Sequence, residues 1–415
     1  MTSKLERIKK MVENNSHARC YTPYGNPNSR LWQPLKVGNK TIKHRVGLAP
    51  LTRYRAPNHI PQAFVAEYYK QRASGGLLVT EATFIAKEAG GYPFAPGIYN
   101  QEQVEAWKAV TKAVHEKESV IYCQLWALGR ANGGKEEGVE VVSASNIPVE
   151  EGAPIPRALT IEDIKRYMSH YKHAARNAIE AGFDGVEIHG AHGYLPDQFL
   201  QRSSNNRGDI YGGSLENRAR FALEALESVT QEIGQERTAI RISPFSVFQG
   251  MGHEEDPFET FGYLVSEIKK RFPKLAYISV TDNRFGNASQ DDKLLTCDKF
   301  RAILRGVDPK NVSKFTKDKA ITLPDPSVEH PTVFFSAGGY SASEAEPHSD
   351  RTGDVVAFGR VFIANPDLPH RIRNGLELNP YDRSTFYTHD QAGYTDYPFA
   401  NESTKKYAPA LTPSL

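Results

Sequence analysis

The chain has 415 residues, a mass of 46.3 kDa and a formal charge of +2 at pH 7. Its 51 basic and 49 acidic residues nearly cancel, so it offers no basic field for nucleic acid or an anionic membrane. With 39% hydrophobic and 24% charged residues, the composition is that of a globular protein with a sizeable core.

The cysteines and the N-terminus bear on the compartment. Cys20, Cys123 and Cys297 are odd in number and far apart, so they form neither a disulfide scaffold nor a thiolate zinc site. The N-terminal MTSKLERIKK lacks the apolar core of a signal peptide, and no apolar run approaches the roughly 18 residues of a membrane span. We therefore expect a cytoplasmic protein.

Short apolar runs alternate with amphipathic helical stretches along most of the chain. Residues 1–30 are polar and lack periodicity, so an N-terminal arm is expected there. Near-continuous apolarity is typical of strands that are buried on both faces of a parallel sheet. The runs that fit this description are VGLAPL (46–51), LLVTEATF (77–84), VIYCQLW (120–126), FDGVEIH (183–189), AIRIS (239–243), AYISV (276–280), TVFFSA (332–337) and DVVAFG (354–359).

The stretches between these runs carry helix signals. Asn100 precedes a long helical pattern and is an expected N-cap. TIED (160–163) offers a capping box for a helix to about Ala181, which Gly182 ends. A further helical segment begins at 214 and runs to about 234.

Eight strand–helix units predict an α/β fold of the (β/α)8 TIM-barrel type. The alternative, a doubly wound sheet, requires a glycine-rich fingerprint after the first strand, and PLTRYR (50–55) contains no glycine. We therefore predict one barrel domain over 31–400 and a C-terminal tail over 401–415. Loop insertions are expected near 127–158 and 283–330, with a short helix at 297–305.

Barrel enzymes carry their catalytic groups where the strands end. The sharpest signal is HGAHGY (189–194), directly after the fourth predicted strand. Its glycines allow a sharp turn that points His189 and His192 at one spot, where two ring N–H groups would hold an oxygen that is or becomes negative. Tyr194 would supply a proton at the same place.

Two other interpretations of this motif stay open. A zinc site would need a third ligand nearby, and this HxxH spacing differs from the helical HExxH motif. The histidines and the tyrosine could also be core residues without a function.

A phosphate site is predicted after the seventh and eighth strands, where barrels often bind phosphate. Gly338 and Gly339 end the seventh strand, and Gly359 and Arg360 end the eighth. Paired glycines let backbone N–H groups approach an oxyanion, and an arginine adds bidentate contacts. These residues therefore predict a phosphorylated ligand.

From LWQPLKVGN (31–39) to GYTDYPF (393–399), the chain resembles the old yellow enzymes, the FMN-dependent ene-reductases. Several motifs in series fall in that family's order. They are LAPLTRYRA (48–56), QLWALGRA (124–131), HGAHGYL (189–195), DIYGGSLENRARF (209–221), FGRVFIANPDL (358–368) and YDRSTFY (381–387).

The resemblance implies a non-covalent FMN, with NADPH or NADH as the reductant. Thr52 matches the threonine that hydrogen-bonds the flavin C4 carbonyl, and Arg241 matches a guanidinium near flavin N1. The other residues that match cofactor contacts are Pro50, Leu51, Ala82, Gln124, Gly338, Gly339, Gly359 and Arg360.

The resemblance also implies a reaction. His189 and His192 match the pair that binds a substrate's carbonyl or nitro oxygen, and Tyr194 matches the proton donor. Trp126 and Tyr394 match aromatic walls around the substrate. The implied activity is ping-pong reduction of enals, enones and nitroalkenes, with hydride from flavin N5, in a monomer or homodimer.

The chain departs from the family pattern in two places. Residue 192 is histidine where part of the family has asparagine, although both are donors, and Asp282-Asn283-Arg284 differs from the expected Glu-Pro-Arg-like sequence. Two alternative functions remain. One is a flavin isomerase or a pathway-specific reductase of one metabolite, and the other is a barrel that only binds a phosphorylated ligand.

Overall fold

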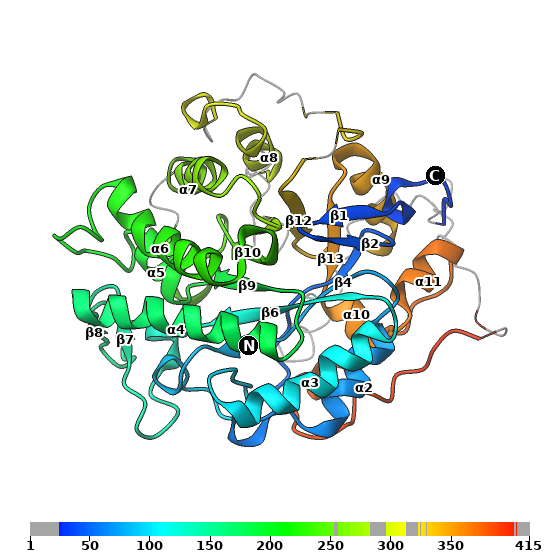
Figure 1. The fold of residues 1–415 in the computed structure, drawn as a ribbon, viewed down its shortest axis with the longest axis horizontal. Coiled ribbons are helices and arrows are strands. Elements are labelled where there is room, and N and C mark those ends of the chain that lie inside the picture. The colour runs from blue at the N-terminus through cyan, green and yellow to red at the C-terminus, as the bar shows by residue number, and fades with distance from the viewer. Residues whose placement is uncertain are drawn as a thin grey trace, which may run out of the picture.

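The structure is a computed structural model that describes residues 25–252, 256–282, 296–312, 323, 325–328, 330–401 and 404. Parallel strands form a closed barrel at its centre (Figure 1). Around the barrel they follow the order β4 (Leu77–Val79), β3 (Val46–Leu48), β13 (Val355–Phe358), β12 (Val333–Ala337), β11 (Tyr277–Thr281), β10 (Thr238–Ile242), β9 (Gly185–Gly190) and β6 (Val120–Trp126). Pairing of β6 with β4 closes the circle, which confirms the barrel and its eight predicted strands.

Helices surround the strands on the outside (Figure 1). The α-helices are α2 (Ala63–Arg72), α3 (Gln101–His115), α4 (Ile161–Glu180), α5 (Leu195–Leu200), α6 (Leu215–Ile233), α7 (Pro257–Arg271), α8 (Asp298–Leu304), α9 (Ala342–Thr352), α10 (Arg360–Ala364) and α11 (Leu368–Asn374). Short 3-10 turns include η1 (Arg30–Trp32), η2 (Pro57–His59), η3 (Lys87–Ala89), η4 (Gly129–Asn132), η5 (Gln235–Arg237), η6 (Phe248–Gly250), η8 (Pro309–Asn311) and η9 (Arg383–Thr385).

The predicted helix signals are confirmed at three helices. The Asn100 side chain caps α3 in a capping box. At α4, Thr160 Oγ1 accepts the Asp163 N–H at 3.1 Å, and Asp163 Oδ2 accepts the Thr160 N–H at 2.9 Å. Helix α6 starts after residue 214 and ends at Gly234, which has a φ of 89°. Side-chain caps satisfy amide groups that a helix start leaves open, so these boundaries are encoded locally.

Smaller strands lie outside the barrel. Strands β1 (Leu35–Val37) and β2 (Lys40–Ile42) form an antiparallel hairpin, and its turn residue Gly38 approaches Glu236, just before β10. Strand β5 (Thr83–Phe84) pairs with the end of β6. The predicted insertion at 127–158 contains β7 (Val142–Ser143) and β8 (Arg157–Ala158), which pair with each other.

Parts of the remaining predictions fall outside the described residues. Helix α8 confirms the predicted helix at 297–305, whereas residues 283–295 and 313–322 of the same insertion are not described. Of the predicted arm, only residues 25–30 are described, and the Gly25 and Asn26 amides donate to the Glu346 carboxylate of α9 at 3.0 Å. The boundaries of the arm and the tail stay predictions.

The barrel interior changes character along its axis. Inward positions near the amino ends of the strands carry apolar or aromatic side chains, such as Tyr122, Ala239 and Tyr277. Because inward positions recur every second residue, the next ones carry polar side chains, as in Gln124 on β6 and Arg241 on β10. The packed lower barrel therefore supports a polar layer at the carboxyl end.

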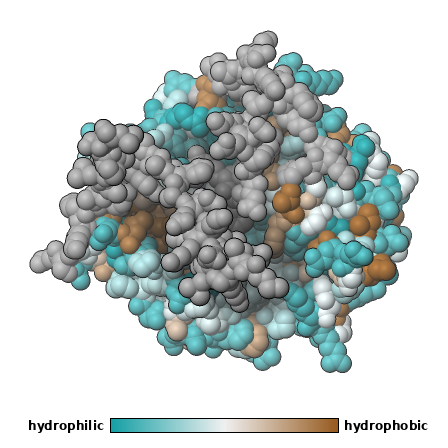
Figure 2. Space-filling view, turned by 180° about the vertical axis from the view of Figure 1, so that it is seen from behind, coloured by the Kyte–Doolittle hydropathy of each residue, from teal (hydrophilic) through white to brown (hydrophobic). Residues whose placement is uncertain are grey.

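Hydrophilic residues make up most of the coloured surface on one side of the molecule (Figure 2). On the side opposite to Figure 1, the coloured surface shows hydrophobic residues only in small separate patches (Figure 2). Among the described helices, none combines the length and apolarity needed to cross a membrane.

Candidate active site at the carboxyl end of the barrel

A layer of buried polar side chains lines the carboxyl end of the barrel. Strand pairing sets Gln124 of β6 beside Glu187 of β9, and it sets His189 beside Arg241, which in turn lies beside Ser279 of β11. Each of the five is at most 9% exposed. Arg241 Nε, Glu187 Oε2, His189 Nδ1 and Ser279 Oγ have no hydrogen-bond partner among the described residues. Buried polar atoms are rarely left unpaired, so this layer is shaped for a polar ligand.

Glu187 and Arg241 bring opposite charges into this layer. The Glu187 Oε1 atom accepts a hydrogen bond from Gln124 Nε2 at 2.7 Å. Burial raises the pKa of Glu187 to about 7, against the opposing influence of the Arg241 charge. Burial likewise lowers the pKa of Arg241, and Glu187 works against this shift. The sequence prediction contained Gln124 and Arg241 but missed Glu187.

The turn after β9 orients the two histidines. His192 has a φ of 57° and Gly193 a φ of 75°, so two successive left-handed residues reverse the chain. The His192 N–H donates to Ser243 Oγ at 2.7 Å, and its carbonyl accepts from Gln249 Nε2 at 2.7 Å. A left-handed histidine costs on the order of 1–3 kcal/mol, and these two bonds hold it. Gly190 is needed for a different reason, close packing against β10, because a Cβ there would approach the Arg241 carbonyl oxygen at 3.0 Å.

The structure brings His189, His192 and Tyr194 together as predicted. The imidazole centroids lie 5.7 Å apart with perpendicular planes, and the Tyr194 ring lies 4.7 Å from that of His189. Burial lowers the pKa of both histidines well below the usual value, so each ring is neutral and offers one N–H. Within the described residues, no group of three metal-binding side chains surrounds this motif.

Tyr194 and Trp126 form one side of the site. The two rings meet edge to face with centroids 5.0 Å apart, and Trp126 stacks on Phe84. Burial raises the pKa of Tyr194 far above that of a free phenol, so the hydroxyl keeps its proton at neutral pH. A protonated phenol beside neutral imidazole donors can act as a general acid.

Tyr394 is not placed with these residues, contrary to its expected position at a substrate wall. Its ring is completely buried and stacks on Tyr68 with centroids 4.1 Å apart. The guanidinium carbons of Arg53 and Arg55 lie 4.9 and 4.5 Å from its centroid. Two buried arginines need an electron-rich surface, and Tyr394 provides it in the core.

Tyr387 is an exposed aromatic residue of the C-terminal segment that lies closer to the site. It is 61% exposed, and its ring lies 5.6 Å from that of Tyr54. Tyr54 contacts Tyr92, which in turn contacts Trp126, so an aromatic series leads from Tyr387 to the site. Tyr387 ends the motif YDRSTFY, but only the fold indicates that its ring lies beside Tyr54.

The loops after β3 and β4 meet beside this aromatic series. The Arg53 N–H donates to Glu81 Oε2 at 3.0 Å, which ties the loop that carries Pro50, Leu51 and Thr52 to the bend that carries Ala82. Ala82 belongs to the same cluster as Trp126. The predicted contacts for the flavin ring therefore come from neighbouring loops at one end of the barrel.

The predicted phosphate residues lie at the ends of the neighbouring strands β12 and β13. Gly338 and Gly339 have φ values of 131° and 82°, and a Cβ on Gly339 would meet no atom within 4 Å. A Cβ on Gly359 would approach Leu51 Cδ2 at 3.1 Å, which links this strand end to the loop after β3. Backbone amides that border open space, together with Arg360, fit a phosphate. With the unpaired polar atoms of the barrel layer, these residues fit FMN.

Arg130 was not predicted and connects two loops beside the site. It is 2% exposed, and its guanidinium donates to the carbonyls of Ile147 and Pro148 at 3.3 and 3.1 Å. It also donates to the carbonyls of Gln249 and Gly250, both at 3.1 Å. Because Gln249 holds the His192 carbonyl, Arg130 links the insertion at 127–158 to the histidine turn.

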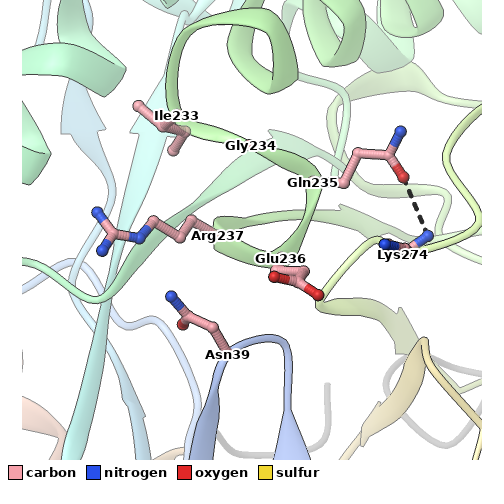
Figure 3. Close-up of a pocket in the computed structure, with 7 residues that line it drawn as sticks. All are labelled: Asn39, Ile233, Gly234, Gln235, Glu236, Arg237 and Lys274. Atoms are coloured by element: carbon pink, nitrogen blue, oxygen red, sulfur yellow. Dashed lines mark hydrogen bonds between the residues drawn. The ribbon is translucent and has the colours of Figure 1, made fainter.

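A surface pocket lies at the opposite end of the barrel, where β10 begins (Figure 3). It is lined by residues 233–237 with Asn39 and Lys274, and Gln235 Oε1 accepts the Lys274 N–H at 3.0 Å. Catalytic groups of barrels lie at the carboxyl ends of the strands. We therefore assign the active site to the end that carries the histidines.

Comparison with known proteins shows which family the chain resembles. Residues 30–379 match the model of the NADH:flavin oxidoreductase / NADH oxidase family. NADP-dependent oxidoreductase lnbE of Aspergillus flavus is 43% identical over 90% of this chain and 97% of its own length. Chanoclavine-I aldehyde reductase fgaOx3 of Penicillium roqueforti is 45% identical over 91% of this chain and 98% of its own length.

A solved structure gives the same result. Morphinone reductase in complex with tetrahydroNAD superimposes with a TM-score of 0.76 at 37% identity, over 91% of this chain and 99% of that one. The chain is thus an oxidoreductase with FMN as its cofactor and a nicotinamide nucleotide as its reductant. It belongs to the NADH:flavin oxidoreductase family, the old yellow enzymes.

Proposed function

We propose that this chain reduces carbon–carbon double bonds that are activated by a carbonyl or nitro group. The observation that carries the proposal is the protonated phenol of Tyr194 beside the neutral imidazoles of His189 and His192 at the carboxyl end of the barrel. Enals, enones and nitroalkenes have an oxygen that the imidazoles can bind and a carbon that the phenol can protonate. A monomer or homodimer in the cytoplasm is part of this proposal.

The cofactor is held by three groups of residues in this proposal. Gly338, Gly339, Gly359 and Arg360 bind its phosphate, Pro50, Leu51, Thr52 and Ala82 contact its ring, and Gln124 and Arg241 hold the pyrimidine end. Bound FMN supplies the hydride that it has taken from NADPH or NADH.

The substrate is polarised by the imidazoles. Ring N–H groups of His189 and His192 donate to its carbonyl or nitro oxygen and withdraw electron density from the double bond. They need no reorganisation, because the bonds from Ser243 and Gln249 hold the turn. Tyr194 protonates the α-carbon, while Trp126 and Tyr387 border the substrate.

Tyr194→Phe tests the proposal, because it keeps the ring and removes the proton. Flavin reduction by NADPH should stay within a few-fold of wild type, whereas enone reduction should slow by roughly 10²–10⁴, the usual range for a general acid. Stopped-flow absorbance measures the two half-reactions separately. Nitroalkenes should still accept hydride, because their anionic products are stable without a carbon-bound proton.

Tyr92→Phe is the matched control. The Tyr92 hydroxyl donates to the Ala131 carbonyl at 2.6 Å, so it is not available to a substrate. Both half-reactions of this variant should remain near the wild-type rates. Equal slowing of both halves in Tyr194→Phe, or of neither, would contradict the assignment of Tyr194.

A second candidate is the same chemistry on a single metabolite. The similarity to chanoclavine-I aldehyde reductase supports it, since that relative is named for one dedicated substrate. A panel of simple enones, enals and nitroalkenes separates the two candidates. A general reductase accepts several of them with comparable kcat/KM, whereas a dedicated one accepts all of them poorly.

A further inference from the structure

Glu187 is a buried carboxyl group that the proposed reaction does not use. It is 0% exposed and lies one inward position below His189 on β9. Its Oε1 atom accepts from Gln124 Nε2 at 2.7 Å, while Oε2 has no partner among the described residues. Oε2 can therefore bind a proton while the bond from Gln124 to Oε1 is kept.

The groups that face this carboxyl come from three strands. Arg241 on β10 is the charged one, and Tyr277 on β11 and His189 on β9 are the titratable ones. Between Glu187 and Tyr277 the paired residue on β10 is the small Ala239, so the phenol faces the carboxyl. The Tyr277 hydroxyl is a side-chain donor that is placed to hydrogen-bond this carboxyl.

The charges of this layer depend on one arginine. Burial raises the pKa of Tyr277 and lowers that of His189, so both stay neutral near pH 7. Arg241 is then the positive charge that stabilises a Glu187 carboxylate, in addition to hydrogen bonds from Gln124 and Tyr277, and its Nε atom has no partner among the described residues. Any second negative charge placed beside Arg241 competes directly with Glu187.

We infer that Glu187 is a redox-linked proton acceptor, which binds a proton when reduction places a negative charge on the cofactor beside Arg241. This inference rests on the proposed position of the flavin over Arg241. Hydride transfer from NADPH brings two electrons and one hydrogen nucleus to the cofactor and releases NADP⁺, which leaves one added negative charge in the layer. Glu187 takes one proton from solvent in compensation. It returns that proton when the hydride leaves for the substrate.

The exchange keeps the net charge around Arg241 constant. A layer that is buried away from water has a low effective dielectric constant, which penalises an uncompensated second negative charge. Because the pKa of Glu187 is raised to about 7 by burial, a modest further rise on reduction suffices for proton uptake near neutral pH. In this scheme Glu187 compensates the charge of the reduced cofactor and does not contact the substrate.

Potentiometry of the FMN-loaded enzyme between pH 5.5 and about 9 tests the inference. Uptake of one proton per two electrons gives a slope of about 30 mV per pH unit, and uptake of two protons gives about 59 mV, because about 29.6 mV corresponds to a tenfold change for a two-electron couple. Wild type should show the steeper slope just above pH 7. Glu187→Gln, which keeps an acceptor for Gln124, should show the shallow slope throughout.

The sign of the potential gives a second readout. Above pH 7 the wild-type carboxylate opposes the arriving electrons, so Glu187→Gln should have the higher potential there. Below pH 6 both side chains are neutral, and the two potentials should converge. If the plot of reduction potential against pH keeps its steep part in Glu187→Gln, the inference is overturned.

Tyr277→Phe is the matched control, since it removes the facing phenol and keeps the carboxyl. It should retain the steep segment. Loss of that segment in Tyr277→Phe, with retention in Glu187→Gln, would assign the proton to the phenol and overturn the inference.

Wild type offers a test that does not depend on a folded variant. Anaerobic reduction by NADPH in weak buffer with a pH indicator should consume up to one proton per flavin just above pH 7, and absence of uptake at every pH would overturn the inference. A wild-type protein that retains no FMN would instead contradict the proposed cofactor site.

Discussion

Burial keeps both imidazoles of the site neutral, and this determines which ligands they prefer. Each ring presents an N–H donor without a positive charge, and His189 Nδ1 has no partner in the described chain. Paired donors favour an anionic oxygen over a neutral one. The pair therefore prefers a phenolate to the phenol, as well as an oxygen that becomes negative during the reaction.

Phenols should thus bind over the oxidised flavin as phenolates and produce a long-wavelength charge-transfer absorption. His189→Ala removes a hydrogen bond to a charged oxygen, which contributes about 1.5–3 kcal/mol, so binding should weaken by roughly 10- to 150-fold. Spectrophotometric titration measures the dissociation constant.

His115→Ala is the control for this titration, because His115 lies on α3 and bonds to Asp184 at 2.9 Å, away from the site. Its phenol affinity should equal that of wild type. Unchanged affinity in a His189/His192 double alanine variant would show that the pair does not bind the ligand oxygen.

At the scale of elements, the site depends on loops that follow different strands. The insertion at 127–158 and the loop after β10 meet at Arg130, whose guanidinium donates to four carbonyls in the two loops. Since Gln249 bonds to the His192 carbonyl at 2.7 Å, this connection extends to the left-handed turn. Arg130 thereby holds the turn that carries the proposed catalytic histidines.

Arg130→Met should loosen both loops and lower kcat/KM for enones by roughly 10- to 100-fold, since a displacement of about 1 Å costs rates of this order. The methionine keeps an apolar stem of similar length but leaves the four carbonyls unpaired. Hydrogen exchange should speed up at residues 146–150 and 248–251, and FMN content should stay unchanged.

Arg166→Met is the corresponding control on α4, where the arginine bonds to Glu88 and Asp163 at the surface. Exposed ion pairs contribute little, so its kcat/KM should remain at the wild-type value. A similar loss of activity in both variants would contradict a specific role for Arg130.

At the scale of the whole molecule, several buried groups change the free energy of unfolding with pH in opposite directions. Burial raises the pKa of Glu81 and Glu187 to about 7, whereas burial lowers the pKa of His44 to about 4. A raised carboxyl pKa makes stability fall as pH rises from the unfolded value to the folded one, because the folded state keeps a proton that the unfolded state has lost. A lowered histidine pKa has the opposite effect. These contributions partly cancel, so a single group must be isolated by substitution.

Glu81→Gln isolates one of these contributions. Glu81 is 2% exposed and accepts the Arg53 N–H, a bond that the amide oxygen can keep. The variant and wild type should have similar free energies of unfolding at pH 5. At pH 8 the variant should be more stable by about 1–3 kcal/mol, since one pKa unit corresponds to about 1.4 kcal/mol. Urea unfolding of the FMN-loaded protein at both pH values measures this, and a constant difference would contradict a raised pKa of Glu81.

Most of the fold could be predicted because its signals are local. Apolar runs of four to eight residues mark strands that are buried on both faces, and the caps at Asn100 and Thr160 mark helix starts that the structure confirms. The pairing of β13 with β3, by contrast, joins the last strand of the barrel to the first and so closes the barrel across the whole domain. Barrel closure was inferred from the number of strand–helix units, because no single residue encodes it.

The sequence by itself determined the barrel, the family and the residues of the histidine motif, since a short segment holds His189, His192 and Tyr194 together on one turn. Only the tertiary structure decided which residues from distant segments join them. It buries Tyr394 under two arginines while it exposes Tyr387, and it brings Arg130 to Gln249 and Glu187 to the layer of Arg241. These relations depend on which inward or outward position each strand and loop residue takes after the barrel closes. That choice follows from long-range packing, which local sequence patterns do not contain.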